Sequence, residues 1–252
     1  MAKVSQIITY CDELLNPTAF KDYAPNGLQV EGKSDVKVVV SGVTATQALI
    51  EKAIALNADM LLVHHGYFWK GEDPRLIGMK GRRVKALMQH NINLVGYHLP
   101  LDGHPELGNN AQLGKVLGLQ NVEVKGQGYA ENILFTGELP EAIHADRLSQ
   151  HLFDCLQRQP LHISAGDQLI KKLAWCTGGA QGFIDQAAEL GVDAYLSGEI
   201  SEKTTHEARE SGIHYFAAGH HATERYGVLA LGEHLAEQFS LEHHFVDVDN
   251  PA

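Results

Sequence analysis

Short apolar runs alternate with segments of helical apolar spacing along this chain. Residues 36–41 and 59–63 are apolar runs of strand length, and residues 46–56 between them repeat apolar side chains every three or four positions. A strand buried on both faces reads as a continuous apolar run, whereas a helix packed on a sheet shows the longer period. The alternation therefore predicts β-α-β units, which are typical of an α/β fold with parallel strands.

The same order of segments recurs in the second half of the chain. Residues 172–197 again read as strand, helix and strand, and an offset of 134 positions places Asp193 on Asp59. Strands are also expected at 92–97 and 213–218, and each is followed within two residues by a histidine that has an acid four positions later. These histidines, His98 and His220, give an offset of 122 positions for this element. We predict two similar α/β lobes related by internal duplication. The alternative is the general likeness between any two β-α-β units.

The middle of the chain is less informative and separates the two lobes. Residues 122–170 read as a strand hairpin and a helix without a further chemical motif. We therefore predict a first lobe at 1–125 and a second at 126–252, which together form one functional unit.

The composition is that of an ordinary globular protein with an acidic balance. The 252 residues are 44% hydrophobic and 20% charged, and the formal net charge of −11 argues against duplex nucleic acid as a partner. No apolar stretch approaches the ~18 residues that span a bilayer, and no signal-peptide core is evident. The three cysteines are scattered, so no disulfide framework is expected and the predicted location is the cytoplasm.

Candidate metal ligands lie where predicted strands end, which is where open α/β sheets place their sites. His64 and His65 directly follow the run at 59–63, and Gly66 comes next. Adjacent side chains in a regular strand point to opposite faces, but at a strand end beside a glycine they can splay toward neighbouring ions. Adjacent histidines are therefore awkward for one tetrahedral ion and favour a dinuclear centre.

Acidic residues complete the predicted ligand set. His220 and Glu224 have the i,i+4 spacing that places two side chains on one helix face, provided that the helix begins near residue 219. Asp102 stands four positions after His98, but Pro100 between them argues against a helix there. Asp102 is therefore the expected ligand, and His98 is expected next to the ligands or as a general acid or base.

These ligands are too few for two separate tetrahedral sites, so we expect carboxylates shared between two divalent ions. Imidazoles and carboxylates without thiolate suit iron, manganese, zinc or nickel. A lone histidine at a strand end is more often structural, but the adjacent pair together with placed acids favours metal binding. Two ions can activate water at neutral pH, which indicates hydrolysis as the reaction. The predicted ligands are His64, His65, Asp102, His220 and Glu224.

Strings at residues 62–66, 197–200 and 218–224 resemble one known family. They read Leu-Val-His-His-Gly, Ser-Gly-Glu-Ile and Ala-Gly-His-His-Ala-Thr-Glu, and are similar to the dinuclear-metal, NIF-like family of GTP cyclohydrolase 1 type 2 homologs. The chain looks most similar to the short bacterial YbgI-like branch, which lacks an inserted middle domain. The resemblance covers nearly the whole chain. It implies two ions at the junction of the lobes and a homohexameric ring.

The resemblance also implies a function. It suggests a metal-dependent hydrolase, like a type 2 GTP cyclohydrolase, that acts on a nucleotide or purine-type substrate, with clearance of damaged nucleotides and DNA-damage protection as related hypotheses. His98 would donate a proton to the leaving group, and Glu199 would act as a base or orient a ligand. The alternative is a non-catalytic, metal-stabilised ring that serves as a scaffold or regulator. Nucleic-acid binding through a basic inner lining is a third, less favoured hypothesis.

Residues beside the predicted ligands have two interpretations each. Lys70, Tyr67 and Arg225 either hold a phosphate or purine or have ordinary surface roles. Trp69 either stacks on a base or packs beside the strand end, and packing is favoured.

Overall fold

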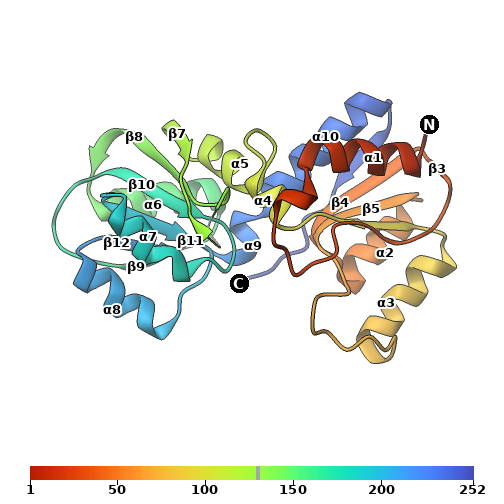
Figure 1. The fold of residues 1–252 in the computed structure, drawn as a ribbon, viewed down its shortest axis with the longest axis horizontal. Coiled ribbons are helices and arrows are strands. Elements are labelled where there is room, and N and C mark those ends of the chain that lie inside the picture. Colours follow the sequence, from red (N-terminus) through yellow and green to blue (C-terminus); the bar gives the residue numbers. More distant parts are fainter. Residues whose placement is uncertain (129–130) are drawn as a thin grey trace. The chain divides into compact units, whose positions relative to one another are not determined.

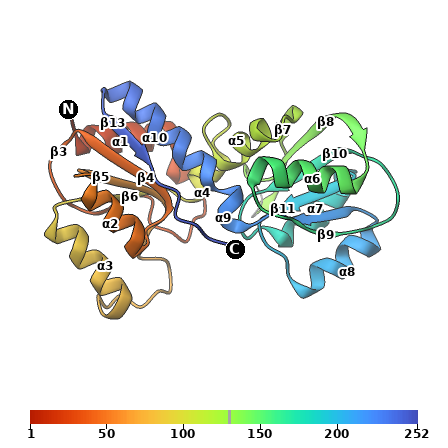
Figure 2. The ribbon, with the colours of Figure 1, turned by 180° about the vertical axis from the view of Figure 1, so that it is seen from behind.

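The computed structural model describes residues 1–128 and 131–252, and the chain divides into two compact units. Each unit is a sheet covered by helices on its faces, so the predicted α/β class with sheets of similar size is confirmed (Figures 1 and 2). The first unit comprises Met1–Leu101 and Gly227–Asp249, and the second comprises Asp102–Tyr226 and Asn250–Ala252. In the described residues, no helix is both long and apolar enough to cross a membrane.

The sheet of the first unit has the strand order β13-β4-β5-β6-β2. All neighbours pair parallel except β2, which runs antiparallel to β6 at one edge. A separate antiparallel pair joins β1 to β3. The strands are β1 (Ala2–Lys3), β2 (Gly27–Val30), β3 (Asp35–Val36), β4 (Val38–Thr44), β5 (Met60–His65), β6 (Asn93–Gly96) and β13 (Glu242–Phe245).

Helices cover the two faces of this sheet. Figures 1 and 2 show α2 and α3 on one face and α1 and α10 on the other. Val40, Leu61 and Leu94 of the central strands pack in one buried cluster with residues of α2 and α3. The Thr46 side chain accepts a hydrogen bond from Leu49 N and so caps α2. The helices are α1 (Val4–Leu15), η1 (Pro17–Ala19), α2 (Gln47–Ala55), α3 (Gly78–Gln89) and α10 (Arg225–Phe239).

The sheet of the second unit has the strand order β7-β8-β10-β11-β12-β9. Its central strands β10, β11 and β12 pair parallel, and the outer strands run antiparallel to their neighbours. The strands are β7 (Gln120–Val124), β8 (Phe135–Ile143), β9 (Leu161–Ile163), β10 (Ile170–Cys176), β11 (Ala194–Ser197) and β12 (His214–Ala217).

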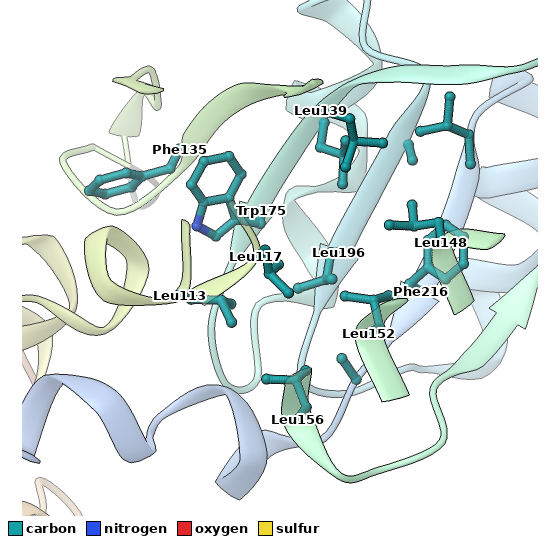
Figure 3. Packing of buried hydrophobic residues seen from close by; sticks show 14 of the residues in the cluster. Leu113, Leu117, Phe135, Leu139, Leu148, Leu152, Leu156, Trp175, Leu196 and Phe216 are labelled. Carbon is teal, nitrogen blue, oxygen red and sulfur yellow. The ribbon is translucent and has the colours of Figure 1, made fainter. Parts of the chain in front are cut away.

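A hydrophobic core lies between this sheet and the helices α5 and α6 (Figure 3). Trp175 and Leu196 of the sheet pack in one cluster with Leu113 of α5 and Leu152 of α6. The indole Nε1 of Trp175 donates to the backbone oxygen of Asn110 at 2.9 Å, which satisfies its buried polar group. The helices are α4 (Leu99–Gly103), α5 (Asn109–Val116), α6 (Ala145–Leu156), η3 (Gln181–Phe183), α7 (Ile184–Glu189), α8 (Glu202–Ser211) and α9 (His220–Thr223).

Strand register supports the predicted duplication. Val39 of β4 pairs with Met60 of β5, and Leu173 of β10 pairs with Ala194 of β11. Both members of the second pair lie 134 positions after those of the first, which is the predicted offset. An aspartate repeats at the same offset. Asp59 Oδ2 accepts the backbone amides of residues 37 and 38, and Asp193 Oδ2 accepts those of residues 171 and 172.

The third parallel strand follows a different offset from the predicted one. Met60 pairs with Asn93, and Ala194 pairs with His214, so β6 and β12 are related by 121 positions. His98 therefore corresponds to Gly219, one position before His220. Aligning the two histidines in the sequence suggested an offset of 122. The difference of one arises because His98 stands two positions after β6, whereas His220 stands three positions after β12.

The compact units differ from the predicted division at residue 125. Strand β13 pairs with β4, which brings the C-terminal segment into the first unit, and β7 pairs with β8, which brings residues 120–124 into the second. Helix α5, which follows β6 and α4, packs in the second core, whereas α10, which follows β12 and α9, belongs mostly to the first unit. The two repeats thus exchange their final helices. Local periodicity cannot predict such an exchange, because it depends on contacts between distant segments.

The repeated aspartate generates a stability prediction. Asp193→Ala leaves two backbone amides at the start of β10 without their acceptor, so the free energy of unfolding should fall by about 1–3 kcal/mol. Asp167→Ala, at an exposed position before the same strand, should change it little. Urea unfolding of the two variants measures the difference, and equal stabilities would contradict the role assigned to Asp193.

Candidate metal centre

A histidine cluster lies at the carboxyl ends of β5 and β6 in the first unit. His64 and His65 are the last residues of β5, and His98 stands two positions after β6. One ring nitrogen from each lies within 4.8 Å of the others. The rings of His64 and His65 have centroids only 4.5 Å apart although the residues are adjacent in a strand. The structure therefore brings His98 together with both predicted ligands.

The Nδ1 atoms of His64 and His65 are held by neighbouring strands. His64 Nδ1 lies 2.9 Å from the backbone oxygen of Tyr97, which can only accept, so Nδ1 carries the proton. His65 Nδ1 lies 3.3 Å from Thr44 Oγ1. Donation from Nδ1 leaves the lone pair of His64 on Nε2, and this is how metal-binding histidines are usually oriented.

His98 is held in the same way by a carboxylate. Its Nδ1 donates to Asp22 Oδ1 at 2.8 Å, while Asp22 also accepts from Asn26 Nδ2 and from the backbone amide of Leu99, each at 3.0 Å. Burial raises the pKa of Asp22, but the hydrogen bonds from His98 and Asn26 outweigh it and lower the pKa to about 2. Asp22 is therefore ionised at neutral pH. No sequence motif marked it, because its loop meets His98 only in the folded chain.

The second unit contributes a histidine held between two carboxylates. His220 opens the single turn α9, and its Nε2 lies 3.2 Å from Glu224 Oε2. Its Nδ1 lies 2.7 Å from Glu199 Oε1. Burial lowers the pKa of His220, but the hydrogen bonds and charges of Glu224 and Glu199 outweigh it and raise the pKa to about 9. Without metal, the ring is therefore an imidazolium at neutral pH.

Asp102 is fixed by a buried amide network in the second unit. Its Oδ1 accepts from Asn109 Nδ2 at 2.9 Å and from Thr177 Oγ1 at 3.3 Å. The Asn110 side chain links the backbone at Asp102 to the backbone at Thr177. Its Nδ2 donates to Asp102 O at 3.1 Å, and its Oδ1 accepts from Thr177 N at 3.0 Å. These contacts restrict the carboxylate to one orientation, as hydrogen bonds to metal-binding carboxylates do.

The local backbone at Asp102 corrects one expectation. Pro100 argued against a helix, but α4 runs over Leu99–Gly103. Pro100 lies in its first turn, where backbone amides have no intrahelical acceptor and proline costs nothing.

Gly178 leaves the space in which Glu224 lies. Its φ of +67° is in the left-handed region, and a Cβ at this position would overlap Glu224 Oε1 and lie 3.0 Å from His220 Nε2. Its amide donates to Thr223 Oγ1 at 3.1 Å, and its carbonyl accepts from the amide of Gly198 at 2.9 Å. Only glycine satisfies both the dihedral angle and the close approach.

These side chains fit divalent metal. The donors are imidazole nitrogens and carboxylate oxygens, which suit first-row transition metals. Ligand atoms about 2 Å from one ion lie roughly 3 Å apart, and the 3.2 Å between His220 Nε2 and Glu224 Oε2 matches this spacing. Each candidate histidine has its Nδ1 engaged by an oxygen, which makes Nε2 the nitrogen that can coordinate an ion.

Two residues beside the predicted ligands have structural roles. The Tyr67 hydroxyl donates to the backbone oxygen of Ala45 at 2.6 Å, and burial raises its pKa. Arg225 Nη2 donates to the backbone oxygen of Leu156 at 2.8 Å. These contacts engage the Tyr67 hydroxyl and one nitrogen of Arg225, whereas Lys70 is exposed.

Known proteins resemble this chain over its full length. A model of the family described as Duf34/NIF3 (NGG1p interacting factor 3) matches residues 2–251. A protein of Allochromatium vinosum named GTP cyclohydrolase 1 type 2 homolog is 54% identical over 252 residues, covering 100% of this chain and 98% of the relative. The solved structure of protein ybgI, at 51% identity, has a TM-score of 0.94, and one from Thermus thermophilus, at 31%, has 0.90. Both cover 100% of each chain.

The raised pKa of His220 predicts a pH-dependent stability of the metal-free protein. The folded pKa of about 9 exceeds the ordinary 6.5, so protonated His220 stabilises the fold fully below about pH 6.5. This contribution is lost as the pH rises through 9. An NMR titration of the imidazole should show the raised pKa in the wild type and a lower one in Glu224→Gln. Titration of the wild-type ring near 6.5 would contradict the assignment.

The space at Gly178 predicts a specific loss of metal binding. Gly178→Ala combines a strained dihedral angle, which costs about 1–2 kcal/mol, with displacement of Glu224. We expect a lower melting temperature and reduced metal content by elemental analysis. Gly182→Ala is the matched control, because nothing lies within 4 Å of the added Cβ and its φ is not in the left-handed region. Wild-type metal content in Gly178→Ala would refute the argument.

Proposed function

Because the chain belongs to the Duf34/NIF3 family, we propose that it is a hydrolase that uses two divalent metal ions. The hydrogen bonding of the histidines carries this proposal. Nδ1 of His64, His98 and His220 donates to an oxygen acceptor, so Nε2 is the nitrogen that can bind metal or exchange a proton. The proposed ligands are His64, His65, Asp102, His220 and Glu224.

The proposal requires ligands from both units to share ions, and chain connectivity supports it. The chain leaves the first unit after Leu101 and re-enters it at Gly227. His98 and Asp102 are four positions apart, which limits the distance between their Cα atoms to about 14 Å. Glu224 lies three positions before Gly227. Candidate ligands of the second unit therefore stand next to the peptide links that join the units.

His98 and Asp22 supply the proton chemistry in this proposal. When bound, divalent ions act as Lewis acids and make water nucleophilic at neutral pH. Asp22 fixes the tautomer of His98 through Nδ1, as the aspartate does in hydrolase triads, so Nε2 can pass a proton to a leaving group. Glu199 holds His220 through Nδ1, so we assign it a positioning role instead of that of a general base.

The proposed substrate is a nucleotide or a purine-type compound. The name of the curated relatives, GTP cyclohydrolase 1 type 2 homolog, supports this class. Clearance of damaged nucleotides is the biological role we favour within it. The family resemblance also favours a homohexameric ring in the cytoplasm, and we include both in the proposal.

The metal ions are tested first, by elemental analysis of protein purified without added metal. We expect about two ions per chain in the wild type, because a hydrolytic dinuclear centre needs both, and a clear loss in His65→Ala and Glu224→Ala. His206→Ala, at an exposed position on α8, should retain the wild-type content. One ion or none, unchanged by these substitutions, would reject the ligand assignment.

Catalysis is tested on the metal-loaded protein with intact and oxidised nucleotides. His98→Gln should lower kcat by about 10²–10⁴-fold while the five proposed ligands keep the metal in place. Asp22→Asn should lower kcat less and shift its pH profile, because His98 loses its charged partner. Metal-loaded protein that turns over no nucleotide would favour the scaffold alternative.

A further inference from the structure

An aromatic cluster adjoins the histidines of the first unit. The Trp69 ring meets His98 edge-on with centroids 4.9 Å apart, and its centroid lies 5.9 Å from that of His65. Tyr23 meets His98 edge-on at 5.0 Å and lies 5.5 Å from Trp69 with 36° between the planes. The two rings thus contact each other and the imidazole of His98.

The cluster is held in place by its backbone. Lys70 N donates to the carbonyl of Tyr23 at 2.8 Å and ties the loop after β5 to the loop that carries Asp22. Trp69 Nε1 donates to the carbonyl of Gly66 at 3.1 Å, which fixes the plane of the indole. A stacking surface of this kind needs little reordering when a ligand binds.

Both rings keep part of their surface exposed. Tyr23 is 54% exposed and Trp69 is half-buried. Neither belongs to the cluster that packs α2 and α3 on the sheet. An exposed aromatic surface beside a polar cluster is the arrangement that proteins use to bind flat ring systems.

We propose that Tyr23 and Trp69 form a stacking platform for a planar heteroaromatic ring that carries an anionic group, such as a nucleotide. The inference rests on the proposed function and adds the residues that select the substrate. A ring stacked here would lie beside His98. Two acids also lie beside the platform, but Asp22 is hydrogen-bonded to His98 and Glu72 is paired with Lys80. Lys21 and Lys70 are exposed and flank the platform in sequence, and they favour an anionic group on the ligand.

The two tryptophans of the chain make binding measurable. Trp175 is fully buried in the core of the second unit, so Trp69 is the tryptophan that a ligand can reach. Guanosine 5′-monophosphate should quench the indole fluorescence of metal-free protein, and ribose 5-phosphate should not. Trp69→Phe should abolish the quenching. Equal effects of the two probes would overturn the proposal, because phosphate alone would then account for binding.

Calorimetry of guanosine 5′-monophosphate binding tests the side chains. Tyr23→Ala and Trp69→Ala should each weaken binding by about tenfold, the usual contribution of one stacked base. Phe68→Ala is the matched control, an exposed ring in the same loop that packs on Tyr67 and Lys80, and it should bind as the wild type does. Unchanged binding in the Tyr23 and Trp69 variants, or no binding to folded wild type, would reject the platform.

Metal analysis of the same samples separates this inference from the proposed function. Nucleotide binding without metal supports the platform even if the ligand assignment fails. A dinuclear centre without ring binding leaves the metal site standing and overturns the platform.

Discussion

The shared direction of the central strands is the constraint on which the candidate site depends. Strands β4, β5 and β6 run parallel in one unit, and β10, β11 and β12 run parallel in the other. Parallel pairing places the carboxyl ends of neighbouring strands at one edge, where loops are free to carry chemistry. His65 ends β5, His98 follows β6, and His220 follows β12. Within the first unit, sheet register therefore sets the spacing of His65 and His98, and hydrogen bonds at Nδ1 orient the rings of His64, His98 and His220.

Periodicity was sufficient to predict the central parallel strands of both sheets, the helices between them at α2 and α7, and the offset of 134, since each depends on residues close together in the chain. It was not sufficient where distant segments meet. The pairing of β13 with β4 changes the boundaries of the units, and no local pattern encodes it. Asp22, Asn109 and Thr177 have ordinary sequence surroundings and gain their roles only when their loops reach His98 and Asp102. The spacing of the histidines suggested an offset of 122 for the third strand, but strand pairing relates β6 and β12 by 121 positions.

Electrostatics favours metal in the second unit. Asp102 and Glu224 are almost fully buried, and a buried carboxylate is costly unless a partner offsets the loss of hydration. In the metal-free chain, the imidazolium of His220 is one such partner for Glu224, which the raised pKa of that ring reflects. A divalent ion bound at this pair would displace this proton, so metal affinity here should rise with pH. When no ion is bound, the charge of His220 offsets that of Glu224.

The duplicated strand ends have diverged for a steric reason. His64 and His65 correspond by register to Gly198 and Glu199. A Cβ at Gly198 would lie 2.7 Å from both the carbonyl oxygen of Gly178 and the Cα of His220, so no side chain can occupy that position. The backbone of α9 fills the space that an imidazole takes in the first unit. Glu199 accordingly holds His220 from outside the ligand set. The close approach of the α9 backbone to Gly198 thus excludes a second pair of adjacent histidines at this strand end.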